Sequence, residues 1–131
     1  MNKNIRWIQR FDNFKKAFIR LTDAVDRKEY DELSEAGLIQ TFEFTFELAW
    51  KTLKDYLESK GTIAKLPRDV IKVSFQNSII EDGETWIDML EKRNLLSHAY
   101  DEKTSRIALS YIKNNYFEAI KQVFDFLKNE L

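Results

Sequence analysis

Large apolar side chains recur at steps of three and four residues along this chain, and that period is typical of α-helices. The first stripe comprises Trp7, Phe11, Phe14, Phe18, Leu21 and Val25. The second comprises Ile39, Phe42, Phe46, Ala49, Leu53 and Leu57, with Phe44, Leu48 and Trp50 adding a second apolar side. We therefore expect a helix over about 4–26 and another over about 34–59, the second buried on more than one face. Asp31 or Ser34 would cap the second helix, and Gly61 would end it.

Three more helices are expected in the second half of the chain. A short one over about 67–78 has a proline in its first turn, and another over about 84–96 follows an Asp-Gly turn. The last begins after the N-cap Asp101 and runs to the end. Core positions expected here are Val70, Ile71, Ser74, Phe75, Ala108, Ile112, Tyr116, Ala119, Ile120, Val123 and Leu127. The pattern predicts an all-α fold, an antiparallel bundle of four to five helices, as a single domain over 1–131.

Composition excludes several other classes of protein. Three Gly and one Pro in 131 residues are too few for the turns of an all-β fold or for a Gly-rich phosphate loop, and the lack of Cys excludes disulfides and thiolate chemistry. With 21 basic and 22 acidic residues, any RNA site must be local, because the bulk charge offers no attraction. No apolar run approaches about 18 residues and the start lacks a signal-peptide core, so we expect a cytoplasmic protein. Ten Phe, five Tyr and three Trp exceed the needs of one small core, which indicates a homodimer or a partner protein.

A polar stripe runs through the second expected helix. It comprises Gln40, Glu43, Glu47 and Lys51. One interpretation is an ordinary Glu47–Lys51 pair on a solvated face, worth a few tenths of a kcal/mol. The other is a buried or interfacial polar ladder that contacts a partner or substrate, because aromatic residues flank it on both sides. Spacing alone favours neither.

The only histidine, His98, lies close to Arg93 near an expected helix end. On a straight helix the two would be about 140° apart around the axis and about 7.5 Å along it, so they reach one phosphate only if the helix loosens or a second copy approaches. A neutral imidazole can take a proton from a ribose 2′-OH, and a guanidinium can hold the non-bridging phosphate oxygens. A lone histidine is more often structural, however, and this spacing often arises by chance.

The eight residues from Arg93 to Tyr100 carry a more specific signal. They read Arg-Asn-Leu-Leu-Ser-His-Ala-Tyr, which resembles the Arg-x4-His-x-Tyr motif of the HEPN superfamily. The closest likeness is to its HepT branch, whose members are also described as nucleotidyltransferase substrate-binding proteins. The segment 40–51, with its Phe-Glu-Phe run, is similar to that branch's second helix. The order of the remaining pieces also matches, so the resemblance covers essentially the whole chain.

The resemblance implies a dimeric helical bundle whose two motifs face each other, with a small minimal nucleotidyltransferase as its protein partner. In the toxin–antitoxin form of this pair, the HEPN member is a metal-independent RNase. Arg93 and His98 match its catalytic pair. Tyr100 matches the tyrosine onto which the partner transfers AMP to silence the toxin, and the added charge and bulk would repel an RNA phosphate.

The leading hypothesis is therefore a HepT-like endoribonuclease toxin that acts on RNA without a metal or another cofactor. Arg93 and His98 are its expected catalytic residues and Tyr100 its control site. Supporting side chains are expected to be Asn94, Ser97 and Asp101. The alternative is a non-catalytic substrate-binding subunit of a two-component nucleotidyltransferase, with the polar stripe at the contact. A purely structural helical dimer is a third hypothesis.

Overall fold

The computed structural model describes residues 2–97 and 101–131, except for the side chains of 95–97, and every regular element in these ranges is helical. The elements are α1 (Lys3–Val25), α2 (Glu32–Ser59), α3 (Pro67–Gln76), α4 (Gly83–Ser97), α5 (Glu102–Tyr111), the π-helical turn η1 (Ile112–Tyr116) and α6 (Phe117–Asn129). The predicted all-α fold is confirmed, and the helix boundaries agree with the sequence pattern to within about two residues except in the last segment.

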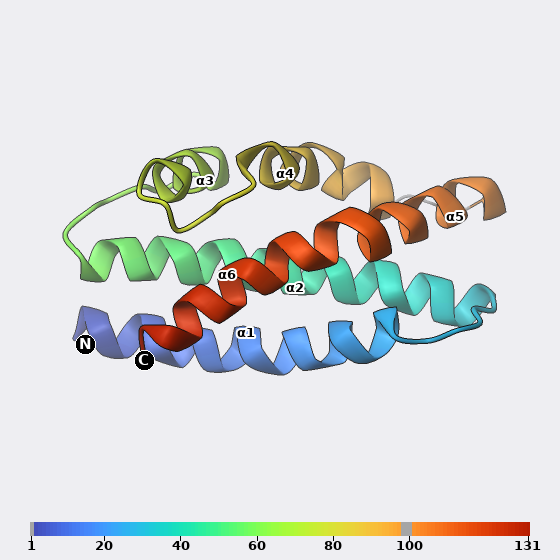
Figure 1. Ribbon diagram of the computed structural model, residues 1–131, viewed down its shortest axis with the longest axis horizontal. Coiled ribbons are helices and arrows are strands. Elements are labelled where there is room, and N and C mark those ends of the chain that lie inside the picture. Colours follow the sequence, from blue (N-terminus) through green and yellow to red (C-terminus); the bar gives the residue numbers. More distant parts are fainter. Residues whose placement is uncertain (1, 98–100) are drawn as a thin grey trace.

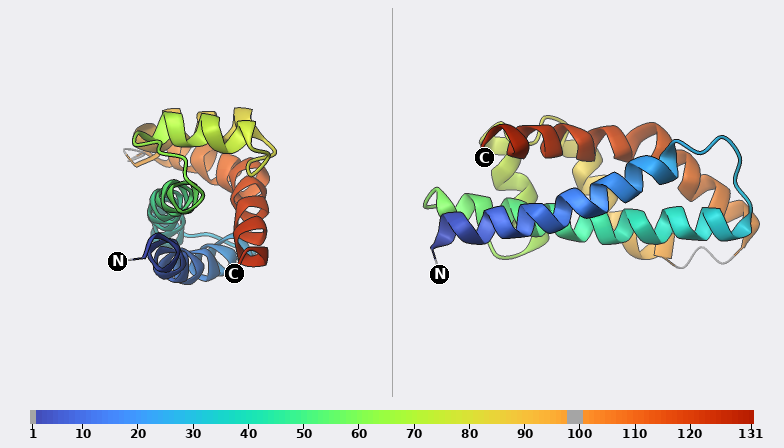
Figure 2. Two further views of the ribbon diagram at one scale, coloured as in Figure 1. Left: turned by 90° about the vertical axis from the view of Figure 1, so that its left-hand side faces the viewer. Right: turned by 90° about the horizontal axis from the view of Figure 1, so that it is seen from below.

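The two longest helices, α1 and α2, lie side by side and antiparallel, and the rest of the chain packs over them (Figure 1). α3 lies across the long pair: it is viewed nearly along its axis in Figure 1 and lengthwise in the left view of Figure 2. The chain returns through α5, η1 and α6, which brings both termini to the same end of the bundle (Figure 1).

The apolar stripes of α1 and α2 form the centre of the core, as predicted. All twelve stripe residues are buried, and Phe14, Leu21, Phe42, Phe46 and Leu53 are fully enclosed. Local signals also act as expected at the ends of α2. Asp31 accepts a hydrogen bond from the Ser34 backbone N–H at 2.8 Å, while the Ser34 hydroxyl accepts one from the Asp31 N–H at 2.9 Å. This capping box satisfies two backbone donors that the helix itself cannot pair. Gly61 follows α2 with a φ of 89°, a conformation that glycine adopts without a side-chain clash.

Three details of the structure differ from the sequence prediction. The last helix runs to Asn129 as expected, but it is not α-helical throughout, because the π-helical turn η1 lies between α5 and α6. Phe75, expected in the core, is half exposed on α3, since α3 is only ten residues long and buries Val70 and Ile71 on its inner side. Phe44 is 54% exposed, so the second apolar side of α2 is covered at Trp50 but not six residues earlier.

Contacts on both sides of α4 hold it in place. Asp82 caps its first turn by accepting hydrogen bonds from the Thr85 backbone N–H at 3.1 Å and from the Thr85 hydroxyl at 2.6 Å. Trp86 is fully buried against Phe46 of α2. On the side of η1, the Tyr116 hydroxyl donates to Asp88 at 2.6 Å. These contacts connect α4 to α2 and to the last segment at once.

Candidate functional site

An arginine–glutamate ion pair joins α4 to α2 at the edge of a pocket. The Arg93 Nη1 atom donates to Glu47 Oε1 at 2.6 Å, although the two residues are 46 positions apart in the sequence. The side chains are 29% and 38% exposed respectively, so the pair is partly shielded from water but open to a ligand. The pocket has a volume of about 420 Å³. Its lining comprises Glu43, Glu47, Trp50, Lys51, Pro67, Arg93 and Asn94.

Helical spacing on α2 explains why its polar side chains meet at this pocket. Glu43, Glu47 and Lys51 are separated by four residues each and therefore lie on one face of the helix. Trp50, one turn after Glu47, donates its indole N–H to Glu47 Oε2 at 2.9 Å. The Lys51 ammonium lies 6.0 Å above the Trp50 ring. The Glu47 carboxylate thus accepts hydrogen bonds from an indole and a guanidinium, and it lines a pocket between α2 and α4.

The structure brings together two groups of residues that the sequence analysis considered separately. Arg93 and Asn94 come from the motif segment, and Glu43, Glu47 and Lys51 come from the polar stripe, yet all five line one pocket. Trp50 and Pro67, which were not predicted as site residues, complete the lining. A tryptophan three residues after a glutamate on a helix was a visible signal for the Trp50 contact. No sequence pattern indicated that Pro67 would lie beside Arg93.

Other predicted site residues lie elsewhere or outside the described ranges. Gln40 is exposed on α2 and is not among the residues that line the pocket. His98, Tyr100 and the side chain of Ser97 lie outside the described residues. Asp101 is the N-cap of α5, as predicted from its position. Its carboxylate accepts hydrogen bonds from the backbone N–H and the hydroxyl of Thr104, both at 2.8 Å, and these bonds lower the pKa of Asp101.

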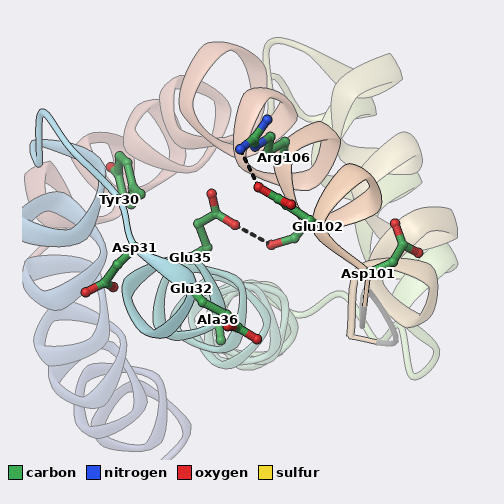
Figure 3. Close-up of a pocket in the computed structure, with 9 residues that line it drawn as sticks. Tyr30, Asp31, Glu32, Glu35, Ala36, Asp101, Glu102 and Arg106 are labelled. Carbon is green, nitrogen blue, oxygen red and sulfur yellow. Dashed lines mark hydrogen bonds and ion pairs between the residues drawn. The ribbon is translucent and has the colours of Figure 1, made fainter.

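A second pocket, of about 600 Å³, opens between the start of α2 and the start of α5 (Figure 3). Its lining comprises Tyr30, Asp31, Glu32, Glu35, Ala36, Asp101, Glu102, Ser105 and Arg106. The Ser105 hydroxyl donates to Glu35 at 2.9 Å, and Arg106 pairs with Glu102. Because five acidic residues and one arginine line this pocket, its net negative charge disfavours phosphate groups. Of these two pockets, the one at Arg93 suits an anionic ligand better, since Lys51 and Arg93 balance Glu43 and Glu47 there.

No three His, Asp or Glu side chains in the described ranges are placed to hold a metal ion together. Within the same ranges, every helix is too short or too polar to cross a membrane. The charged and polar groups that line the pocket at Arg93 are a guanidinium, an ammonium, two carboxylates and an amide.

Comparison with known proteins agrees with this architecture. A family model described as "Nucleotidyltransferase substrate binding protein like" matches residues 9–129. The chain belongs to this family. The resemblance drawn from the motif and from the second helix is therefore confirmed at the level of the family.

One named protein is similar in sequence to this chain. Over 89 residues the chain is 28% identical to a Haemophilus influenzae protein named "Probable ribonuclease HepT", and the match covers 64% of this chain and 61% of that protein. The chain thus matches about three fifths of the length of this curated relative.

Two solved structures share the fold. A protein from Thermus thermophilus superposes with a TM-score of 0.80 and 27% identity, over 88% of this chain and 98% of that one. A second protein, from Haemophilus influenzae, has a structure described as revealing the fold of a substrate binding domain of a nucleotidyltransferase. It superposes with a TM-score of 0.68 and 23% identity, over 97% of this chain and 99% of that one.

Proposed function

We propose that this single-domain protein is a HepT-like endoribonuclease toxin in which Arg93 and His98 cut RNA without a metal ion. The observation that carries the proposal is the position of Arg93 in a partly shielded pocket between α2 and α4, in a chain that belongs to the nucleotidyltransferase substrate-binding family. The name of the Haemophilus influenzae relative supports the same activity.

The proposed reaction uses two side chains with different tasks. His98, as a neutral imidazole, takes the proton from a ribose 2′-OH, and the resulting oxygen attacks the adjacent phosphorus. The bond from phosphorus to the 5′-oxygen breaks, and that oxygen takes up a proton from an imidazolium. Arg93 binds the non-bridging oxygens and stabilises the charge that grows on them. Asn94, Ser97 and Asp101 are proposed as supporting residues.

Single-turnover cleavage of a radiolabelled RNA tests this assignment. The wild type, His98→Ala and Arg93→Ala are compared with Arg6→Ala, because Arg6 likewise pairs with a glutamate of α2, at 3.5 Å from Glu58. We expect the first two variants to lose at least about a hundredfold in rate, in line with the loss of a general base or of a charge-stabilising donor. The Arg6 variant should retain the wild-type rate. Equal rates for all four proteins would remove the assignment.

We further propose that the active form is a homodimer in which a face of α2 contacts a second copy. Leu33 and Phe44 of α2 are 81% and 54% exposed, and large apolar side chains left this open favour an interface. Light scattering after gel filtration should give a dimer for the wild type and a monomer for Phe44→Glu. Phe75→Glu, at an exposed aromatic residue of α3, is the matched control and should remain dimeric.

A minimal nucleotidyltransferase is the proposed protein partner and antitoxin. It would transfer AMP onto Tyr100 and so place a negative charge and a bulky group where RNA has to enter. Intact-mass measurement after co-expression, followed by peptide mapping, should find one AMP on the wild type and none on Tyr100→Phe. A modified protein that still cuts RNA at the wild-type rate would refute this control mechanism.

The alternative function is a non-catalytic subunit that holds a substrate for the transferase. The charge balance of the pocket favours it, because Glu47 already neutralises Arg93 at 2.6 Å, and Glu43 and Lys51 share the same lining. In that case Glu43, Glu47, Lys51 and Gln40 would contact the partner or its substrate. Co-purification with a transferase, together with no RNA decay by protein whose Tyr100 is unmodified, would favour this alternative over the ribonuclease.

A further inference from the structure

The Glu47 carboxylate lies between two donors that approach it from different helices. The Trp50 indole N–H, on the same helix, binds Oε2 at 2.9 Å. The Arg93 guanidinium, on α4, binds Oε1 at 2.6 Å. Because Trp50 is almost fully buried, its indole cannot swing away, and the carboxylate has one oxygen committed to it. The other oxygen is thereby directed at the arginine.

We infer that Glu47 is a positioning residue for Arg93: anchored by Trp50, its carboxylate holds the guanidinium in the pocket in the orientation that receives the scissile phosphate. The inference rests on the proposed ribonuclease function. A free arginine side chain has many rotamers, and binding of a phosphate must meet the entropy cost of fixing one of them unless the side chain is already ordered. The ion pair to an anchored carboxylate provides this order before RNA binds.

The geometry favours a positioning role over competition with the phosphate. A guanidinium has five N–H donors, and the bond to Glu47 uses one of them, so a phosphate can be added without displacing the carboxylate. If a phosphate displaced Glu47 from Arg93, the Glu47 carboxylate, which is only 38% exposed, would keep the Trp50 indole as a partner but lose the guanidinium. The negative charge of Glu47 nevertheless repels a phosphate. Glu47 should therefore increase kcat while it weakens substrate binding slightly.

Glu47→Gln is the decisive variant, because its amide can satisfy one of the two donors but not both. In steady-state cleavage of RNA, we expect kcat to fall about tenfold, with KM unchanged or lower, since a misdirected group is costly in the transition state. Trp50→Phe, which keeps an aromatic ring but removes the indole N–H, should give a smaller loss. Glu58→Gln is the matched control, because Glu58 also lies on α2 and pairs with an arginine of another helix. It should leave kcat unchanged.

Non-additivity distinguishes positioning from a general effect on folding. If Glu47 acts through Arg93, the double variant Arg93→Ala/Glu47→Gln should cleave RNA no more slowly than Arg93→Ala alone. A further loss of about tenfold in the double variant would overturn the inference. A rise in kcat/KM on Glu47→Gln would also overturn it, because it would show that the carboxylate competes with the phosphate.

A readout without RNA separates this inference from the ribonuclease proposal. Phenylglyoxal modifies accessible, unpaired guanidinium groups, and peptide mass spectrometry reports the rate at each arginine. We expect several-fold faster modification of Arg93 in Glu47→Gln, and faster modification of Arg6 but not of Arg93 in Glu58→Gln. If the wild type cuts no RNA, the ribonuclease proposal fails, and Arg93 reactivity alone then decides whether Glu47 holds the arginine. Equal Arg93 reactivity in the wild type and Glu47→Gln overturns the inference whether or not RNA is cut.

Discussion

Tyr116→Phe should destabilise the protein at neutral pH and leave it equally stable at alkaline pH. The Tyr116 side chain is fully buried in the π-helical turn, and its hydroxyl donates to Asp88 Oδ2 at 2.6 Å. Asp88 also binds the Lys92 ammonium at 3.2 Å. The substitution removes one charge-assisted hydrogen bond and changes almost nothing in the packing of the ring.

The expected loss at pH 7 is about 1.5 kcal/mol of unfolding free energy. A hydrogen bond to a charged group contributes about 1.5–3 kcal/mol. The lower end applies here, because the Asp88 side chain is 37% exposed and can bind water and Lys92 in place of the lost hydroxyl.

Ionisation in the unfolded chain cancels this difference in stability as the pH rises. Burial, and then the hydrogen bond to the Asp88 carboxylate, raise the pKa of Tyr116 well above its usual value of 10.0. Folded Tyr116 thus keeps its proton above pH 10, while unfolded Tyr116 loses it, and the stability of the wild type falls as the pH rises. At pH 11 this loss amounts to about 1.4 kcal/mol, and phenylalanine has no such loss.

Urea denaturation at pH 7, 9 and 11, followed by circular dichroism at 222 nm, measures both effects. We expect the wild type to exceed Tyr116→Phe by about 1.5 kcal/mol at pH 7 and by nearly nothing at pH 11. A difference that stays constant across this range would refute the reasoning, since it would mean that folding does not shift the titration of Tyr116. A double-mutant cycle with Asp88→Asn should show that the two side chains are coupled at pH 7.

Further substitutions test the core, a buried charge and a helix cap. Phe42→Ala should cost about 3–5 kcal/mol in urea denaturation, because the fully enclosed ring leaves a cavity, and a loss under about 1 kcal/mol would contradict its place in the core. Arg10→Ala should lower the unfolding free energy by about 2 kcal/mol, because it leaves the buried Asp55 carboxylate without the guanidinium that binds it at 2.8 Å. Adding Asp55→Asn to this variant should recover part of that loss. Hydrogen bonds from the Thr104 backbone and hydroxyl lower the pKa of Asp101, so the stability they supply is present above pH 3.8 and is lost as the pH falls below it. Between pH 6 and pH 3 the melting temperature should therefore fall further for the wild type than for Asp101→Asn, and parallel curves would argue against the cap.

The π-helical turn in the last helix has a counterpart in the spacing of the apolar residues. Its stripe includes Ala108, Ile112, Tyr116 and Ile120, at three successive steps of four, and all four side chains are buried. In a regular α-helix each step of four drifts by about 40° around the axis, so the four side chains would spread over about 120°. The π-helical turn from Ile112 to Tyr116 takes up this drift by widening one turn of the helix. The run of steps of four was therefore a sequence signal for η1, whereas the hydrogen bond from Tyr116 of this turn to Asp88 joins residues 28 positions apart and had no such signal.

Burial of the second apolar side of α2 could not be derived from the pattern. The period placed Phe42 on the main stripe, and Phe42 is fully buried, whereas Phe44 on the second side is 54% exposed. Whether a second side of a helix is covered depends on how helices from distant parts of the chain cross it, and the period of one helix contains no information about that crossing.

Helix type, helix order and most helix ends follow from residues that lie within four positions of each other. The Asp31–Ser34 capping box, the Asp101 cap and the apolar stripes of α1 and α2 are all of this kind, because hydrogen bonds and side-chain contacts on a helix join near neighbours. The pocket is different. Arg93 meets Glu47 across 46 residues, and only the packing of α4 against α2 selects that carboxylate from the others on the chain.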